Sequence, residues 1–89
     1  MDVFDSPSPV PHPRAGVVVP KHRRTAVDRN RLKRRLREVL RGEVMPRLAE
    51  RNIYTDVLVR ARKEAYLATF SQLRDELIAY TDKRWSNAS

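Results

Sequence analysis

The sequence predicts a small domain of the α+β or α/β class, in which helices cover one sheet. Two short β-branched runs, around 14–19 and 54–62, have the length and composition of strands. Each run is followed by a stretch with the apolar spacing of a helix, so the predicted order is strand, helix, strand, helix. A chain of 89 residues buries only about 60 to 65 % of its unfolded surface, and we expect marginal stability.

The N-terminal segment is rich in proline and is expected to be extended. Four of the six prolines lie in "DSPSPVPHP" at 5–13, which can form neither a helix nor a central strand. The following "RAGVVV" is interpreted as a short buried strand from Arg14 to Val19. We therefore divide the chain into an extended segment at 1–13, a domain at 14–85 and a tail at 86–89.

A helix is predicted to begin after Thr25, because "TAVD" lets the Thr25 hydroxyl accept the N–H of Asp28 while the Asp28 carboxylate reaches back. Gly42 is expected to end this helix, and Pro46 fits the first turn of a short second helix through about Arg51. The apolar residues of the first helix form one stripe: Leu32, Leu36, Val39 and Leu40.

The second half of the chain predicts one more strand and one more helix. In "YTDVLVRAR" the side chains alternate between two faces. One face carries Val57, Val59 and Ala61, and the other carries Leu58, Arg60 and Arg62. A capping box from Thr69 to Gln72 then opens the closing helix. Its expected apolar side consists of Phe70, Leu73, Leu77 and Tyr80.

The net charge of +8 is concentrated in one segment, 21–41, which holds ten basic residues and two acids while the rest of the chain balances. Such a concentration indicates a polyanion as partner. A membrane-surface helix is disfavoured because 26–41 has no Trp or Phe. A DNA-binding helix-turn-helix is disfavoured because no helix is predicted ahead of the basic one.

Other functional classes have little support. There is no cysteine, no G-x-S-x-G motif and no glycine-rich phosphate loop. His12 and His22 have no second ligand at metal spacing and are interpreted as solvated loop residues. Asp75 and Glu76 are neighbours that point about 100° apart on a helix, which favours an exposed polar face. No apolar run or leader is present, so the default expectation is a cytoplasmic chain.

The stretch "AVDRNRLKRRLRE" at 26–38 resembles the most specific motif of the bacterial ribonuclease P protein component. In that family a strand of the "VGxVVSKK" type leads through a loop into a helix beginning "AVxRNRxKRxLRE". The counterparts here are "AGVVVPKH" at 15–22 and the helix motif itself, with the spacing kept. Downstream, "DVLVRAR" and "FSQLRDEL" are similar to the family's later strand and final helix, so the resemblance covers about 14–80.

The resemblance implies an α+β fold, a small α–β sandwich of the ribosomal protein S5 domain 2-like kind, with a left-handed β-α-β crossover that the usual handedness rule would not predict. It implies an RNA-binding subunit of an endoribonuclease, a ribonucleoprotein in which the catalytic RNA hydrolyses a phosphodiester to remove the 5′ leader of precursor tRNA. Mg²⁺ would be bound mainly by the RNA, and the protein would supply no catalytic residue. The alternative is another small basic RNA-binding protein, of ribosomal or RNA-chaperone type, without a role in tRNA processing.

The implied RNA-binding residues are all polar and lie in or just before the basic helix. Arginine forks can grip phosphate oxygens at two points, and an asparagine adds a neutral hydrogen bond. Arg29 and Lys33 lie nearer the apolar stripe, so packing of their stems over the sheet remains an alternative. The set is Lys21, Arg29, Asn30, Arg31, Lys33, Arg34, Arg37 and Arg41.

The chain departs from the family pattern in two places. Pro20-Lys21-His22 replaces the usual Ser-Lys-Lys. The family also has an N-terminal helix and a strand with aromatic residues that line a leader-binding cleft, whereas only thirteen residues precede Arg14 here. We therefore expect a shortened domain that lacks this helix and part of the first strand, with Phe4 as a remnant of that strand. Exposed sheet and local charge repulsion predict partial unfolding at low salt, with order gained on binding RNA or other polyanions.

Overall fold

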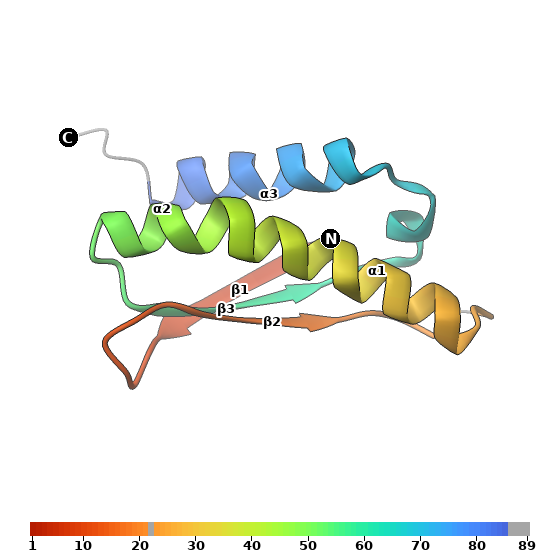
Figure 1. The fold of residues 1–89 in the computed structure, drawn as a ribbon, viewed down its shortest axis with the longest axis horizontal. Coiled ribbons are helices and arrows are strands. Elements are labelled where there is room, and N and C mark those ends of the chain that lie inside the picture. The colour runs from red at the N-terminus through yellow and green to blue at the C-terminus, as the bar shows by residue number, and fades with distance from the viewer. Residues whose placement is uncertain (22, 86–89) are drawn as a thin grey trace.

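The computed structural model describes residues 1–21 and 23–85. His22 and the expected tail at 86–89 lie outside the described residues. Three strands form one sheet, and the helices cover one of its faces (Figure 1), which confirms the α+β class. The elements are β1 (Asp2–Pro7), β2 (Arg14–Val18), α1 (Ala26–Val39), the π turn η1 (Leu40–Val44), α2 (Met45–Glu50), β3 (Thr55–Arg60), the 3-10 turn η2 (Lys63–Leu67) and α3 (Phe70–Arg84).

The sheet has the order β1-β3-β2, with β3 antiparallel to β1 and parallel to β2. The register places Leu58 of β3 opposite Phe4 on one side and Gly16 on the other. The connection from β2 through α1 to β3 passes over the covered face and is left-handed in Figure 1, as the resemblance implied. Most such connections are right-handed, so this topology is a distinctive feature of the fold.

The N-terminal segment is extended, but its first part is not a connection that precedes the domain. Asp2–Pro7 forms strand β1, and Phe4 lies in it, as expected for a first-strand residue. The predicted domain boundary between residues 13 and 14 therefore separates two strands of the same sheet. Proline composition concealed the strand, because Pro7 is tolerated where an edge strand ends.

Strand β2 differs from the expected buried strand. It ends at Val18 rather than Val19, and within it only Val17 is half-buried while the other residues are exposed. The physical reason is that β2 lies at the edge of a sheet covered by helices on one face only. A β-branched run is fully buried only when both faces of its sheet are covered.

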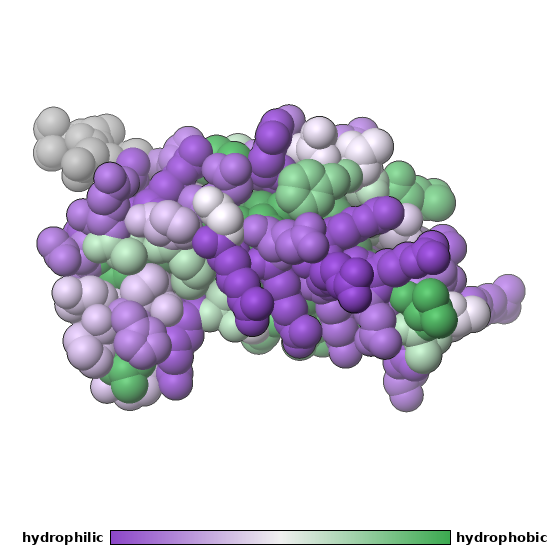
Figure 2. Space-filling view, viewed as in Figure 1, coloured by the Kyte–Doolittle hydropathy of each residue, from purple (hydrophilic) through white to green (hydrophobic). Residues whose placement is uncertain are grey.

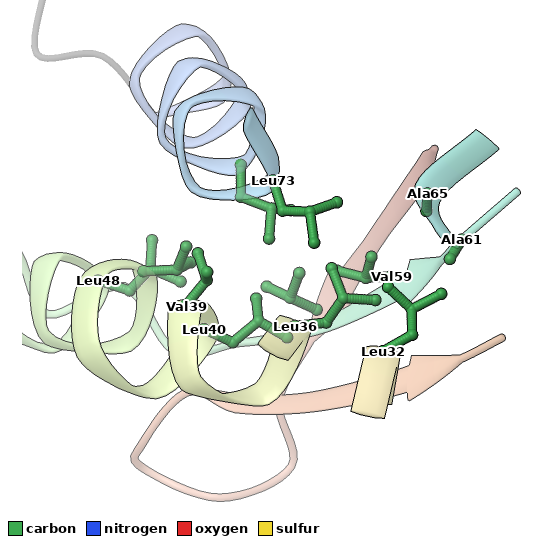
Figure 3. Packing of buried hydrophobic residues seen from close by; sticks show 12 residues of the cluster. Leu32, Leu36, Val39, Leu40, Leu48, Val59, Ala61, Ala65 and Leu73 are labelled. Carbon is green, nitrogen blue, oxygen red and sulfur yellow. The ribbon is translucent and has the colours of Figure 1, made fainter. Parts of the chain in front are cut away.

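The core lies between the helices and the covered face of the sheet, as Figure 3 shows. The four apolar residues of the predicted α1 stripe are all buried, and Val57 and Val59 of β3 and Ala61 directly after it are buried in the same core, as predicted. On α3, Leu73 and Leu77 are buried, but Phe70 is 40 % exposed and Tyr80 is only half-buried. Thr81 takes the third buried position instead, because its hydroxyl donates to the Leu77 carbonyl at 2.8 Å and so satisfies its polar group.

The capping prediction is confirmed fully at Thr69, which forms a reciprocal capping box with Gln72. At Thr25 it is confirmed in part: the hydroxyl accepts the N–H of Asp28 at 3.1 Å, but the Asp28 carboxylate does not accept a hydrogen bond from the Thr25 N–H. The predicted end at Gly42 is wrong, because the helix continues through η1 directly into α2. The left-handed residue that ends it is Asn52, with φ 55°, and the Ile53 N–H donates to the Leu48 carbonyl across the turn.

Candidate nucleic-acid interface

The cations of the basic segment have no acidic partner among the described residues. Among residues 1–21 and 23–85, no ion pair or side-chain hydrogen bond involves a Lys or Arg of positions 21–41. Five of the nine Lys and Arg residues elsewhere in the described chain form ion pairs; for example, Arg14 contacts Asp56 at 2.6 Å and Arg62 contacts Asp2 at 2.9 Å. The positive charge of α1 and the loop before it is therefore available for an external anion.

Five of the eight predicted residues line one surface of α1 and of the η1 turn that continues it. They surround a shallow hollow of about 640 Å³, together with Glu38. Figure 2 shows hydrophilic side chains along the length of this helix. Since the opposite side of α1 is fixed by its buried leucines, these side chains are presented from a rigid backbone. We call this set the major cationic surface: Asn30, Lys33, Arg34, Arg37 and Arg41.

The other three predicted residues lie elsewhere. Lys21 is exposed in the loop ahead of α1. Arg29 is half-buried, and its Nε is buried without a hydrogen-bond partner, which favours the packing alternative for this residue. Lys33, for which the same alternative was open, lies on the major cationic surface.

Arg31 lies on the other flank of α1, in a pocket that sequence reasoning did not find. The pocket is lined by Arg24, Asp28, Arg31, Leu32, Arg35 and Tyr66, and we call it the tyrosine-side pocket. Helical spacing could have placed Arg35 one turn after Arg31. No signal in the sequence brings Tyr66 of η2 beside Arg24.

The uncovered face of the sheet carries a second hollow, of about 500 Å³. Phe4 and Leu58 are 52 % and 42 % exposed there, and Gly16 contributes no side chain. At its rim, Arg14 donates two hydrogen bonds to Asp56, at 2.8 and 2.6 Å, and this holds the pKa of the Asp56 carboxyl below its usual value. The surface thus combines exposed apolar groups with an internally neutralised charge pair.

The described residues offer little for other chemistry. Within residues 1–21 and 23–85 there is no cluster of three or more metal-ligating side chains, and no helix is long and apolar enough to cross a membrane. Asp75 pairs with Arg74, and Glu76 pairs with the N-terminal amine at 3.3 Å. These two acids therefore behave as an exposed polar face rather than as a carboxylate pair.

The fold and these surfaces define a small basic α+β domain that presents an unpaired cationic helix and one uncovered sheet face. The family model described as ribonuclease P matches residues 3–84. The chain therefore belongs to the ribonuclease P protein family, as its helix motif indicated.

Curated relatives are similar over most of this chain. The ribonuclease P protein component of Brucella suis is 42 % identical over 66 residues, which cover 74 % of this chain and 45 % of the relative. That of Micrococcus luteus is 44 % identical over 79 residues, covering 88 % and 58 %. This chain thus spans about half the length of these relatives.

Solved structures show the same fold. The RNase P protein from Thermotoga maritima matches with a TM-score of 0.70 at 24 % identity, covering 91 % of this chain and 74 % of that one. The Staphylococcus aureus RNase P protein matches with a TM-score of 0.68 at 27 % identity, covering 92 % and 71 %.

Proposed function

We propose that this chain is the RNA-binding protein subunit of a bacterial ribonuclease P and assists the catalytic RNA in removing the 5′ leader of precursor tRNA. The observation that carries the proposal is the row of cations on α1 that have no partner among the described residues of a domain of this family. The RNA carries the hydrolytic chemistry, and no protein side chain is assigned a catalytic role.

The major cationic surface binds the backbone of the catalytic RNA. Arg34, Arg37 and Arg41 offer planar forks that match phosphate oxygens, and Lys33 adds a point charge. Four such contacts predict that this surface alone contributes about −3 to −4 to the slope of log K against log[salt]. This contribution corresponds to a loss of affinity of roughly 60- to 250-fold between 50 and 200 mM salt.

The uncovered sheet face holds nucleotides of the leader. Phe4 is an exposed aromatic ring on which a base can stack, and Leu58 continues the apolar floor. Arg14 is neutralised by Asp56, so this face contributes less charge than α1 does. Binding here is therefore expected to depend less on salt than binding at the major cationic surface.

Mg²⁺ is expected to be a cofactor of the complex, bound mainly by the RNA. The described residues do not gather a carboxylate set of the kind that holds this ion in proteins. No step is assigned to a protein-bound metal. The partners are the catalytic RNA and precursor tRNA, with neither a membrane nor a small-molecule substrate, and the cytoplasm is the proposed location.

Reconstitution tests the proposal. The chain is added to a bacterial ribonuclease P RNA at low Mg²⁺, and leader cleavage of precursor tRNA is measured. Stimulation of cleavage is expected, and no stimulation contradicts the proposal. Equal binding to many unrelated structured RNAs would instead support the ribosomal or chaperone-type alternative.

Paired substitutions test the assigned surface. Arg34→Gln with Arg37→Gln should weaken RNA binding and reduce the magnitude of the salt slope by about 2. The matched control, Arg74→Gln with Lys83→Gln, removes the same charge from α3 and should change the slope little. Equal effects of the two pairs would show that net charge, and not the α1 surface, determines binding.

A further inference from the structure

We infer that the tyrosine-side pocket binds the phosphate backbone of a second RNA segment, so that α1 lies between two RNA backbones. This inference rests on the proposed function and concerns a surface separate from the major cationic surface.

The two surfaces lie on different flanks of α1. With Leu36 taken as 0° and about 100° per residue, the major cationic surface extends from about 60° at Lys33 to about 160° at Arg34. On the same wheel, Arg31 and Arg35 fall at about 220° and 260°. The centres of the two surfaces are thus roughly 130° apart, so the two surfaces face different directions from the helix axis.

Contacts from outside α1 build the pocket. Tyr66 belongs to η2, and its hydroxyl donates to the Pro20 carbonyl, which fastens the loop ahead of α1. The Arg24 guanidinium lies over the Tyr66 ring, 4.9 Å from its centroid. In addition, the Arg24 N–H donates to the Lys21 carbonyl at 2.7 Å. Arg24 is therefore positioned by its backbone and by its side chain before any ligand arrives.

The charge in the pocket is not balanced internally. Three arginines, Arg24, Arg31 and Arg35, line it with a single carboxylate, Asp28. Across the part of the chain that the structure describes, none of them forms an ion pair with Asp28 or with any other acid. An anion that entered would meet several arginine forks at once, and this arrangement favours bidentate phosphate binding.

The pocket has room for a ligand larger than water, and its aromatic contact favours a phosphate over a base. The pocket volume is about 110 Å³, well above the ~10–15 Å³ that one water molecule requires. Arg24 already covers one face of the half-buried Tyr66 ring, so that face is not open for base stacking. Stacking leaves the N–H edge of a guanidinium available for hydrogen bonds. The pocket thus fits a phosphodiester group.

Hydroxyl-radical footprinting on a bacterial ribonuclease P RNA tests the inference. Arg31→Gln with Arg35→Gln should abolish protection at one set of nucleotides, and Arg34→Gln with Arg37→Gln at a different set. Each pair should reduce the salt slope by about 2, and the two losses should add. Loss of the same nucleotides in both variants, or an unchanged slope for Arg31→Gln with Arg35→Gln, would overturn the inference.

Three single substitutions separate the pocket's own chemistry from general charge. Asp28→Asn should tighten RNA binding severalfold, because the only carboxylate of the pocket is neutralised while the backbone N–H that Thr25 caps is retained. Arg24→Lys keeps the charge but loses the planar fork and should weaken binding severalfold. Lys83→Gln is the control and should bind as the wild type does. If either pocket substitution leaves RNA affinity unchanged, the inference is contradicted.

The outcome can be distinguished from failure of the proposed function. A wild-type chain that binds ribonuclease P RNA no better than an unrelated structured RNA would contradict the proposed function. In that case the slope of log K against log[salt] can still be measured for the pocket variants on either RNA. A reduced slope would support phosphate binding in the pocket even if the proposed function were wrong.

Discussion

Gly42 provides a direct test of the continuous helix that joins α1 to α2. Gly42 lies inside η1 in a run of helical backbone, and neither glycine has a positive φ. A Cβ added at Gly42 would meet no atom within 4 Å. Glycine inside a helix costs about 0.5–1 kcal/mol relative to alanine. Gly42→Ala should therefore raise the free energy of unfolding by about 0.5–1 kcal/mol and Tm by about 2–8 °C.

The assay is urea and thermal unfolding followed by circular dichroism in moderate salt, where the repulsion within α1 is screened. The urea midpoint should rise while the slope m stays unchanged. Ala49→Gly, at an exposed position of α2, is the converse control and should destabilise by a similar amount. Destabilisation by Gly42→Ala would refute the reasoning, because it would show a left-handed helix end at this glycine, as the sequence alone suggested.

Three further predictions concern the core, the sheet pair and the basic segment. Leu36→Ala should cost about 3–5 kcal/mol in urea unfolding, whereas Val27→Ala, 59 % exposed on the same helix, should change stability by less than about 0.5 kcal/mol; equal losses would contradict the packing. Because Arg14 lowers the pKa of Asp56, their pairing stabilises fully above the ordinary carboxyl value of 3.8 and is lost as pH falls through the lower folded value. Asp56→Asn should accordingly make the urea midpoint fall less steeply below about pH 4, and an unchanged pH profile would refute this. Sulfate should raise Tm more than chloride at equal ionic strength, since it can bridge the unpaired cations of α1; full cooperative structure that is indifferent to anions would contradict the expectation of anion-dependent order.

Sequence alone could predict the candidate site only as a list of residues. It located the basic helix, its motif and the leucines opposite the charges. It could not group the cations, because the grouping depends on what packs beside α1. Arg31 joins Arg24 and Tyr66 only when η2, which follows β3, is brought next to the loop ahead of α1.

Elements whose causes are local could be predicted from the amino-acid sequence. The Thr25 and Thr69 hydroxyls each accept the backbone N–H three residues further on, the leucines of α1 repeat at helical spacing, and β3 alternates between a buried and an exposed face. Each of these signals lies within a few residues of its effect, so it can be read without knowing the rest of the fold.

Three features depend on contacts between distant segments: which segments complete the sheet, which of its faces is covered, and where the joined helix ends. Asp2–Pro7 becomes a strand because β3, some fifty residues later, supplies its partner groups, and β2 stays exposed because it lies at an edge with one face uncovered. Gly42 remains helical because η1 and α2 pack Leu40, Val44 and Leu48 into the same core. The free energy gained by burying these three side chains outweighs the weak preference of one glycine for a helix end.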